Sequence, residues 1–431
     1  MTPVSRKPRQ TVAGNFRWLI CALLFTATVI NYLDRQMIGI FKPELAKIFH
    51  WSERDYAWIV ASFQAAYACG EVLSGPFIEW VGIKGAYAIA IVLWSLATIG
   101  HAPIASVFGF CAARFALGIG ESANWPAAVR TVTEWFPQRE RSAAIGIFNA
   151  GSNVGSIVGP VLIPLLALQL GWQAAFVVLG AIGFVWVSLW FILYEAPGKS
   201  RWLGAEERAH ILAGASHADE RRLPWRSVIR HRETWAYVSS GIFTAPVWWF
   251  FLFWLPDFYG RQFGFNSREF GIRLAAIYAA AALGSIGGGG LSAALLRRGW
   301  TINGARKGAG MACACCALPV MFATRANHAW LATVCFALAA AANQGWSSIM
   351  FTAVSDMFPK RAVASVVGFG GMCSSLVAVG FSRLVGGILQ NTGVYDTILI
   401  YCGAAYMAAL VAFHLLVPQI KPIEIERRQE N

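Results

Sequence analysis

Charged residues are scarce in this sequence of 431 amino acids. Asp, Glu, Lys and Arg make up 13% of it and hydrophobic residues 57%, whereas soluble globular chains carry about 25% charged residues. The mean hydropathy of +0.53 reflects more apolar surface than a soluble domain can bury. The roughly ten-residue alternating segments of a transmembrane β-barrel are also missing. The composition therefore predicts an all-α integral membrane protein.

Signals for cleavage, metal binding and catalysis are missing as well. The first apolar stretch, Phe16 to Ile40, is too long for a signal-peptide core and has no small-residue cleavage site, so we expect a retained helix. The nine cysteines lack paired metal-ligand spacing, and we interpret them as small apolar packing residues. No histidine lies mid-span beside a suitable catalytic partner. The sequence thus predicts no enzyme activity, no metal and no cofactor beyond a coupling ion, for which a proton is expected.

The net charge of +13 comes from basic residues between the apolar segments rather than on one compact face. Such a distribution is typical of membrane topology and not of nucleic-acid binding. On alternate sides of the membrane, the loops and tails hold 24 and 7 Lys and Arg residues. Because cytoplasmic loops retain basic residues, we expect both termini in the cytoplasm and the protein in the plasma (inner) membrane.

Twelve apolar segments long enough to cross a ~30 Å hydrocarbon core are separated by Gly, Pro and charge clusters. They lie near 16–41, 56–78, 85–101, 104–133, 141–169, 173–194, 236–260, 269–296, 307–324, 328–355, 362–390 and 394–417. The predicted organisation is a cytoplasmic tail (1–15), a six-helix bundle (16–194), an amphipathic cytoplasmic linker (195–235), a second six-helix bundle (236–417) and a second cytoplasmic tail (418–431).

The two sets of segments are related in sequence. Thr133–Arg139 aligns with Ser355–Arg361 at an offset of 222 residues, and Ser152 aligns with Ser374 at the same offset. The match falls at the same span boundary in each half, as a duplicated six-helix bundle requires. Parallel repeats of this kind predict a substrate site near the bilayer midplane, between the halves.

Among the ionisable residues inside the predicted spans, four carry the most weight. Asp34 and Arg35 lie late in the first span, and Arg114 and Glu121 lie two helical turns apart on one face of the fourth. Each costs about 2.5 to 3.5 kcal/mol to insert, so each requires a partner or a function. One interpretation is a substrate-binding arginine pair beside acids that carry a proton, all facing a shared aqueous pocket. The alternative is a structural ion-pair network tying the first helix to the fourth.

Other polar positions are weaker candidates. Glu71 could face the same cavity or pair with Arg114 or Arg130, and Arg383 could face the cavity or extend to an interface. In the second half, amide and aromatic groups suit a polyol, although helix packing or an interfacial aromatic belt is the better explanation for any single tryptophan. The candidates for that non-charged end of the substrate are Asn343, Gln344 and Trp346, and additional possibilities are Ser152, Asn153 and Ser374.

Three motifs give the chain a family resemblance. They are Asn31–Arg35, the Arg114-x-x-x-Gly118-x-Gly120-Glu121 run that continues to Pro126, and Glu134–Pro137 with Arg139. Over nearly its whole length the sequence resembles the anion:cation symporter family of the major facilitator superfamily, and most of all its bacterial hexuronate-type members. The resemblance implies substrate binding and coupling at the first-span and fourth-span charges. It makes Tyr32, Arg35 and Arg114 substrate-binding candidates, and Asp34 and Glu121 proton-coupling candidates.

The resemblance is incomplete at the cytoplasmic loop between the second and third spans and at the corresponding loop of the second half. Trp80 stands where the family usually has arginine, and Ala293 and Ala294 stand where related proteins often carry an acid and a base. These departures predict a weakened charge latch between helices, with altered gating and unchanged substrate chemistry.

The sequence therefore predicts a monomeric secondary transporter that imports a sugar-acid anion, hexuronate first of all, together with a proton. Import of a monoanion against an inside-negative potential costs about 2.3 kcal/mol per 100 mV, a penalty that cotransport of a cation removes. Alternatives are an aldonate, aldarate or other carboxylate carrier, a Na⁺-coupled symporter, or a non-transporting sensor on the same fold. The predicted partners are a small carboxylate substrate and the lipid bilayer.

Overall fold

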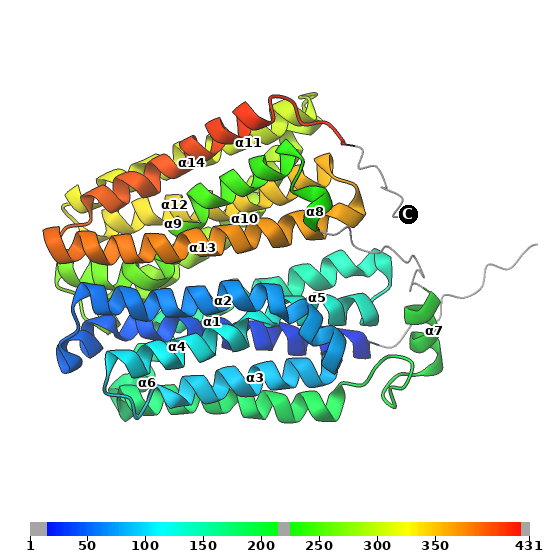
Figure 1. The fold of residues 1–431 in the computed structure, drawn as a ribbon, viewed down its shortest axis with the longest axis horizontal. Coiled ribbons are helices and arrows are strands. Elements are labelled where there is room, and N and C mark those ends of the chain that lie inside the picture. Colours follow the sequence, from blue (N-terminus) through cyan, green and yellow to red (C-terminus); the bar gives the residue numbers. More distant parts are fainter. Residues whose placement is uncertain (1–14, 214–224, 424–431) are drawn as a thin grey trace, which may run out of the picture.

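The computed structural model describes residues 15–213 and 225–423, and this part of the chain is helical apart from short connections (Figure 1). The first half contains α1 (Phe16–Phe49), α2 (Glu53–Val81), α3 (Ile83–Gly100), α4 (Val107–Ser122), α5 (Asn124–Trp135) and α6 (Gln138–Leu193). The linker contains α7 (Ala205–Ala213) and α8 (Trp225–Val228). The second half contains α9 (Arg232–Phe263), α10 (Ser267–Arg297), α11 (Ile302–Ala317), η1 (Leu318–Arg325), α12 (Ala329–Met357), α13 (Lys360–Thr392) and α14 (Asp396–Leu416). Most of both predicted tails and part of the linker lie outside the described residues.

The helices account for the twelve predicted spans. Among the described residues, nine helical segments are long and apolar enough to cross a membrane. One of these, α6, is really two spans, because Gly171 (φ 82°, ψ 161°) turns the chain within it. The more polar α2 is a further span, and α4 with α5 forms the last. Pro126 explains the break between α4 and α5, because it has no N–H to donate at the start of α5.

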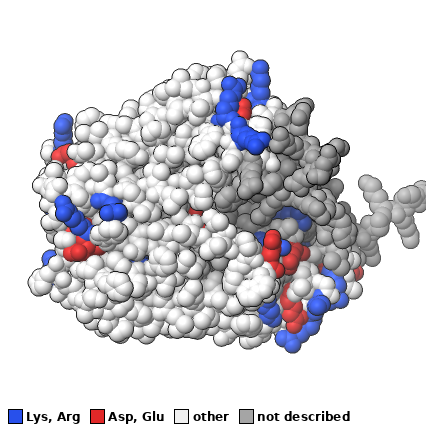
Figure 2. Space-filling model, viewed as in Figure 1, with Lys and Arg blue, Asp and Glu red and all other residues white. Residues whose placement is uncertain are grey.

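The two halves lie against each other along their length in Figure 1, with α1–α6 on one side and α9–α14 on the other. The start of α1, the end of α14 and the linker helices α7 and α8 share one end of the molecule, which we call the linker end. The far end, where α1 meets α2 and α13 meets α14, is called the distal end. Figure 2 shows visible charges concentrated at both ends, with a broad band between them that carries little charge, as a membrane-spanning body requires.

The repeat predicted from the sequence is visible in the backbone. The junction between α5 and α6 passes through Phe136 (φ −121°, ψ 133°) and Pro137 (φ −61°, ψ 152°). The junction between α12 and α13 passes through Phe358 (φ −108°, ψ 144°) and Pro359 (φ −62°, ψ 147°). In both halves an extended residue before proline ends one span, and proline caps the next, as the steric restriction before proline dictates.

Glycine at four-residue spacing brings helices into close contact in both halves. A Cβ at Gly151 of α6 would lie 2.5 Å from the Phe25 carbonyl oxygen of α1, and one at Gly155 would lie 2.7 Å from that of Val29. In the second half, a Cβ at Gly288 of α10 would lie 2.4 Å from the Cα of Gly345 on α12. Such small residues let backbones pack where lipid provides no hydrophobic driving force between helices.

The first helix is longer than predicted, and this corrects one expectation. The predicted span 16–41 places Lys42 in a loop, but Lys42 lies within α1, which continues through Pro43 to Phe49. The assignment failed because hydropathy falls near the end of a long helix even though the helix continues.

The linker is attached to the first half by ion pairs at the linker end. Arg17 near the start of α1 bonds to Glu140 at 2.8 Å and to Glu207 of α7 at 3.0 Å. His210 of α7 also contacts Glu140, at 3.1 Å. Partial burial acts to raise the pKa of Glu140, but the hydrogen bonds from Arg17 and His210 outweigh it and hold that pKa below its ordinary value.

Candidate functional site

The four intramembrane charges of the first half form one cluster. The Arg35 guanidinium of α1 donates through Nε to Glu121 of α4 at 2.9 Å, and through Nη2 to Asn31 at 3.1 Å. Arg114 donates to the backbone carbonyl of Arg35 at 3.4 Å. The structure therefore contains the ion pair between the first and fourth spans that the structural alternative describes, from Arg35 to Glu121. The cluster lies about 28 Å from the start of α1 and about 21 Å from its end, which is near mid-span.

These groups are closed off from solvent in this conformation. Asp34, Arg35, Arg114 and Glu121 are between 0 and 4% exposed. The expectation that they face an aqueous pocket is therefore not met here. The physical reason is a cover of large aromatic side chains from both halves.

Aromatic rings surround the Arg35 guanidinium. Its Cζ lies 4.8 Å from the ring centres of both Tyr32 and Tyr67, and 5.6 Å from that of Trp249 on α9. Phe63 lies between the two arginines, 5.4 Å from Arg35 and 4.3 Å from Arg114. Trp249 comes from the second half, so separation of the halves would remove one side of this enclosure. Tyr32 and Tyr67 are only half-buried and form its most accessible part.

The cluster has more polar atoms than internal partners. Both carboxylate oxygens of Asp34, Nε and Nη2 of Arg114, and Oε1 of Glu121 form no hydrogen bond with any described residue. A fully satisfied structural network would leave few such atoms, because each buried unpaired polar group costs about 1 to 3 kcal/mol. The surplus of donors and acceptors suits a site that exchanges ligands and protons.

Glu71 lies at the boundary between the halves, on the side of α2 that meets α13. Its carboxylate accepts a hydrogen bond from Ser375 of α13 at 3.2 Å. Glu71 does not pair with Arg114 or Arg130, as the structural alternative suggested. Arg130 bonds to Glu79 at 3.0 Å near the linker end, and Arg114 bonds to the carbonyl of Arg35. Glu71 therefore connects the two halves, one helix away from the Arg35 cluster.

The candidate residues of the second half do not join the cluster. Asn343 donates to the Tyr406 hydroxyl of α14 at 2.6 Å, and the Trp346 indole donates to Ser240 at 2.8 Å. Both side chains serve packing within the second half. Gln344, by contrast, is half-buried.

The remaining serine candidates bond to their own helices. The Ser152 hydroxyl donates to the carbonyl of Asn149 at 2.7 Å, and that of Ser374 donates to the carbonyl of Gly370 at 2.7 Å. Asn153 is half-buried on α6. These bonds within the helix satisfy the hydroxyls of both serines without a ligand.

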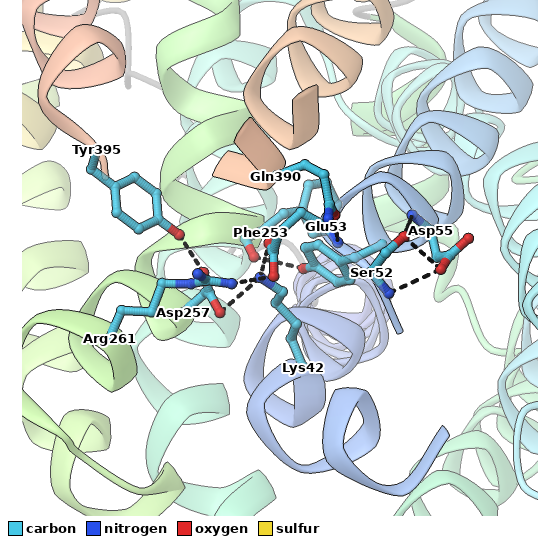
Figure 3. Close-up of polar contacts among 10 residues, drawn as sticks. Lys42, Ser52, Glu53, Asp55, Phe253, Asp257, Arg261, Gln390 and Tyr395 are labelled. Atoms are coloured by element: carbon cyan, nitrogen blue, oxygen red, sulfur yellow. Dashed lines mark hydrogen bonds and ion pairs between the residues drawn. The ribbon is translucent and has the colours of Figure 1, made fainter. Parts of the chain in front are cut away.

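The sequence reasoning missed a second charged network, at the distal end (Figure 3). The Lys42 ammonium of α1 lies 2.6 Å from Glu53 of α2 and 2.7 Å from Asp257 of α9. Arg261 contacts the same two carboxylates, and Tyr395 donates to Asp257. Asp257 lies in the predicted span 236–260 and is buried, and the sequence analysis did not single it out as a buried charge.

This network joins the two halves. Glu53 belongs to the first half and Asp257 to the second, and Lys42 bonds to both. The Tyr56 hydroxyl adds a bond across the same boundary, to the carbonyl of Phe253 at 2.6 Å. The backbone N–H of Glu53 also donates to Gln390 of α13 at 3.0 Å, so polar contacts hold the distal end closed.

The loop between α2 and α3 and its counterpart between α10 and α11 lie at the linker end. One ion pair is found near each of them. Glu79 pairs with Arg130 on an exposed surface, while Trp80 beside it is 85% exposed. In the second half Arg306 bonds to Asp356 at 2.9 Å and to Ser292, directly before Ala293. Each pair lies within its own half, so neither holds the halves together.

Two cavities lie away from the charged cluster. One of about 740 Å³ lies near the distal end between α1, α6 and the connection from α9 to α10, and the other, of about 560 Å³, lies between α2 and α13. None of the four clustered charges lines either cavity.

Similarity to known proteins agrees with this architecture. The chain matches the Major Facilitator Superfamily over residues 24–382. Among solved structures it resembles a D-xylose–proton symporter, with a TM-score of 0.72 at 16% identity, covering 94% of this chain and 98% of that one. It also resembles a bacterial homologue of the human lysosomal transporter Spinster in an inward-facing, occupied conformation, with a TM-score of 0.71 at 18% identity, covering 94% and 96%. At these identities the likeness shows the fold alone.

Several proteins that are similar to this chain in sequence are transporters of sugar acids. The hexuronate transporter of Escherichia coli K12 is 30% identical over 423 residues, covering 96% of this chain and 97% of that protein. A galacturonate transporter of Dickeya chrysanthemi is 34% identical over 257 residues, covering 59% and 74%. The D-galactonate transporter of Escherichia coli O6:H1 is 27% identical, covering 95% and 97%. The chain is therefore a multi-pass inner-membrane transporter, not an enzyme, and it belongs to the Major Facilitator Superfamily, in which its relatives carry sugar acids.

Proposed function

We propose that this protein imports a hexuronate by proton symport. The observation that carries the proposal is the buried cluster of α1 and α4, in which Arg35 pairs with Glu121 while Asp34 and Arg114 keep unpaired polar atoms beside it. The names of the sugar-acid relatives support the substrate class. The positive-inside count supports a cytoplasmic linker end and cytoplasmic termini.

The chemistry follows from competition for Arg35. A substrate carboxylate that binds this guanidinium must displace the Glu121 carboxylate, which now lies 2.9 Å away. Protonation of Glu121 removes its charge, frees Arg35 and prevents an unpaired anion from being left in the membrane interior. Asp34, which has no hydrogen-bonded partner among the described residues, is the second candidate proton carrier. Substrate binding and proton uptake are thereby linked.

Alternating access supplies the movement. With the distal end closed by the Lys42 network, the present arrangement is shut toward the cell exterior in the proposed orientation. Entry of substrate requires that network to separate, and Trp249 to move away from Arg35 with the second half.

The direct test is uptake by proteoliposomes containing the purified chain. An inward proton gradient should drive accumulation of glucuronate or galacturonate, and a Na⁺ gradient at constant pH should not. Glu121→Gln should abolish accumulation driven by the proton gradient yet retain exchange of substrate across the membrane, because binding no longer requires a proton. Intact gradient-driven accumulation in Glu121→Gln would refute the assignment.

Arg35 is tested by binding rather than flux. Arg35→Ala should lose hexuronate binding, since it removes the charge that holds the carboxylate, a loss of about 2 to 5 kcal/mol for a buried charged pair. Arg325→Ala, which removes an exposed arginine of η1 that is not part of the cluster, is the matched control. Near-normal affinity of Arg35→Ala in calorimetry would remove Arg35 from the site.

The remaining alternatives have distinct outcomes in the same assays. Aldonates or aldarates that bind more tightly than hexuronates in a thermal-shift screen would change the substrate. Uptake that follows Na⁺ rather than H⁺ would change the coupling ion. Binding without flux would identify a sensor.

A further inference from the structure

The cavity of about 560 Å³ between α2 and α13 has an unusual lining for a membrane-facing surface. It combines two arginines with a tryptophan and small or apolar residues. The lining residues are Arg54, Ala57, Trp58, Gly380, Arg383, Leu384 and Gly387. We call it the seam groove, because α2 belongs to the first half and α13 to the second.

Both arginines of the seam groove are exposed and lack an acidic partner. Among the described residues, neither Arg54 nor Arg383 forms an ion pair or hydrogen bond with a carboxylate. The neighbouring acids are already engaged: Asp55 accepts from Ser52 at the start of α2, and Glu53 contacts Lys42. Two unpaired positive charges thus point into one groove.

The depth of the groove matches the membrane interface. Arg54 is the second residue of α2, at the distal end, and Arg383 lies nine residues, or about 14 Å, before the end of α13. The Arg383 guanidinium covers the Trp58 ring at 3.9 Å, and Trp58 is 48% exposed. Tryptophan and outward-reaching arginine are typical of the headgroup level of a bilayer. Arg383, which the sequence left between cavity and interface, therefore faces the interface.

Glycines keep the groove open while the helices touch. A Cβ at Gly386 would lie 2.3 Å from that of Ala57, so α13 contacts α2 at this point. Added Cβ atoms at Gly380 and Gly387 would meet nothing within 4 Å. The hollow therefore lies beside a close helix contact, and exposed Leu384 provides an apolar wall suited to an acyl chain.

We propose that the seam groove binds an anionic phospholipid, whose phosphate is held between Arg54 of the first half and Arg383 of the second. A phosphate oxygen is the complementary partner for an unpaired guanidinium, and basic pockets between transmembrane helices are suited to anionic headgroups. In the orientation proposed above, the lipid belongs to the outer leaflet. Since the two arginines come from opposite halves, the bound lipid also stabilises the closed distal end.

Native mass spectrometry of the full chain in detergent tests the site. Phosphatidylglycerol should bind more strongly than phosphatidylcholine with the same acyl chains. Arg383→Gln and Arg54→Gln should each weaken phosphatidylglycerol binding about fivefold, as expected for one basic residue at an anionic headgroup. Arg325→Gln is the matched control, because Arg325 is also an exposed arginine beside an aromatic ring, Phe322, near the distal end, but it does not line the groove.

Several outcomes would overturn the proposal. Equal binding of the two lipids, or wild-type phosphatidylglycerol binding by Arg383→Gln, would mean that the groove has no headgroup site. Displacement of the lipid by inorganic phosphate or by soluble galacturonate would mean that the arginines take a free anion instead. The assay needs no transport, so its failure would leave the proposed hexuronate symport untouched.

Discussion

Replacing Lys42 by glutamine should open the distal end. The Lys42 ammonium is 1% exposed and lies 2.6 and 2.7 Å from the carboxylates of Glu53 and Asp257. Glutamine preserves most of the side-chain length but removes the charge. The closed arrangement then holds two nearly buried carboxylates with Arg261 as their remaining cation.

The magnitude follows from this geometry. Removing one partner of a buried ion pair costs about 3 to 5 kcal/mol, and the remaining Arg261 places Lys42→Gln near the lower value, ~3 kcal/mol. In an arrangement with the distal end open, water solvates both carboxylates, so the loss applies to the closed arrangement alone. A differential loss of ~3 kcal/mol shifts the ratio of closed to open molecules about 150-fold.

Hydrogen–deuterium exchange of the purified chain measures this shift. Peptides from the distal half of α9, around 246–263, should exchange faster in Lys42→Gln than in the wild type, while peptides near the linker end should not change. Lys42→Arg should restore much of the protection. Lys47→Gln is the control, because Lys47 is an exposed lysine on the same helix that forms no ion pair with any described residue. Wild-type protection in a correctly folded Lys42→Gln protein would refute the role of this network as the closed gate.

Two other predictions concern packing and pH. Gly386→Ala should disfavour the closed distal end, because its Cβ would lie 2.3 Å from that of Ala57, whereas Gly387→Ala, with open space around its Cβ, should behave as wild type; equal exchange rates in both variants would contradict this. The attachment of α7 through Glu140 should persist at pH 5 and be lost only as pH falls below the ordinary glutamate pKa of about 4.3, because the pKa of Glu140 is held below that ordinary value. Exchange in α7 that is unchanged down to pH 3 would count against that attachment.

The sequence by itself determined the spans, the repeat and the first charged cluster. Composition required a membrane protein, the Phe-Pro junctions at 136 and 358 marked equivalent boundaries, and seven-residue spacing placed Arg114 and Glu121 on one face of α4. These are local properties, set by the cost of placing polar groups in lipid and by the period of the helix. They identified Arg35 and Glu121 before any contact between them was known.

The tertiary structure decided which charges meet across the halves. Lys42 and Asp257 are separated by more than two hundred residues, and no hydropathy or periodicity pattern links two such positions. Their pairing depends on how two bundles dock, as do the exposure of Arg383 in the seam groove and the packing roles of Asn343 and Trp346. The sequence shows that a buried charge requires a partner. Which residue lies close enough to be that partner depends on how the two halves pack together.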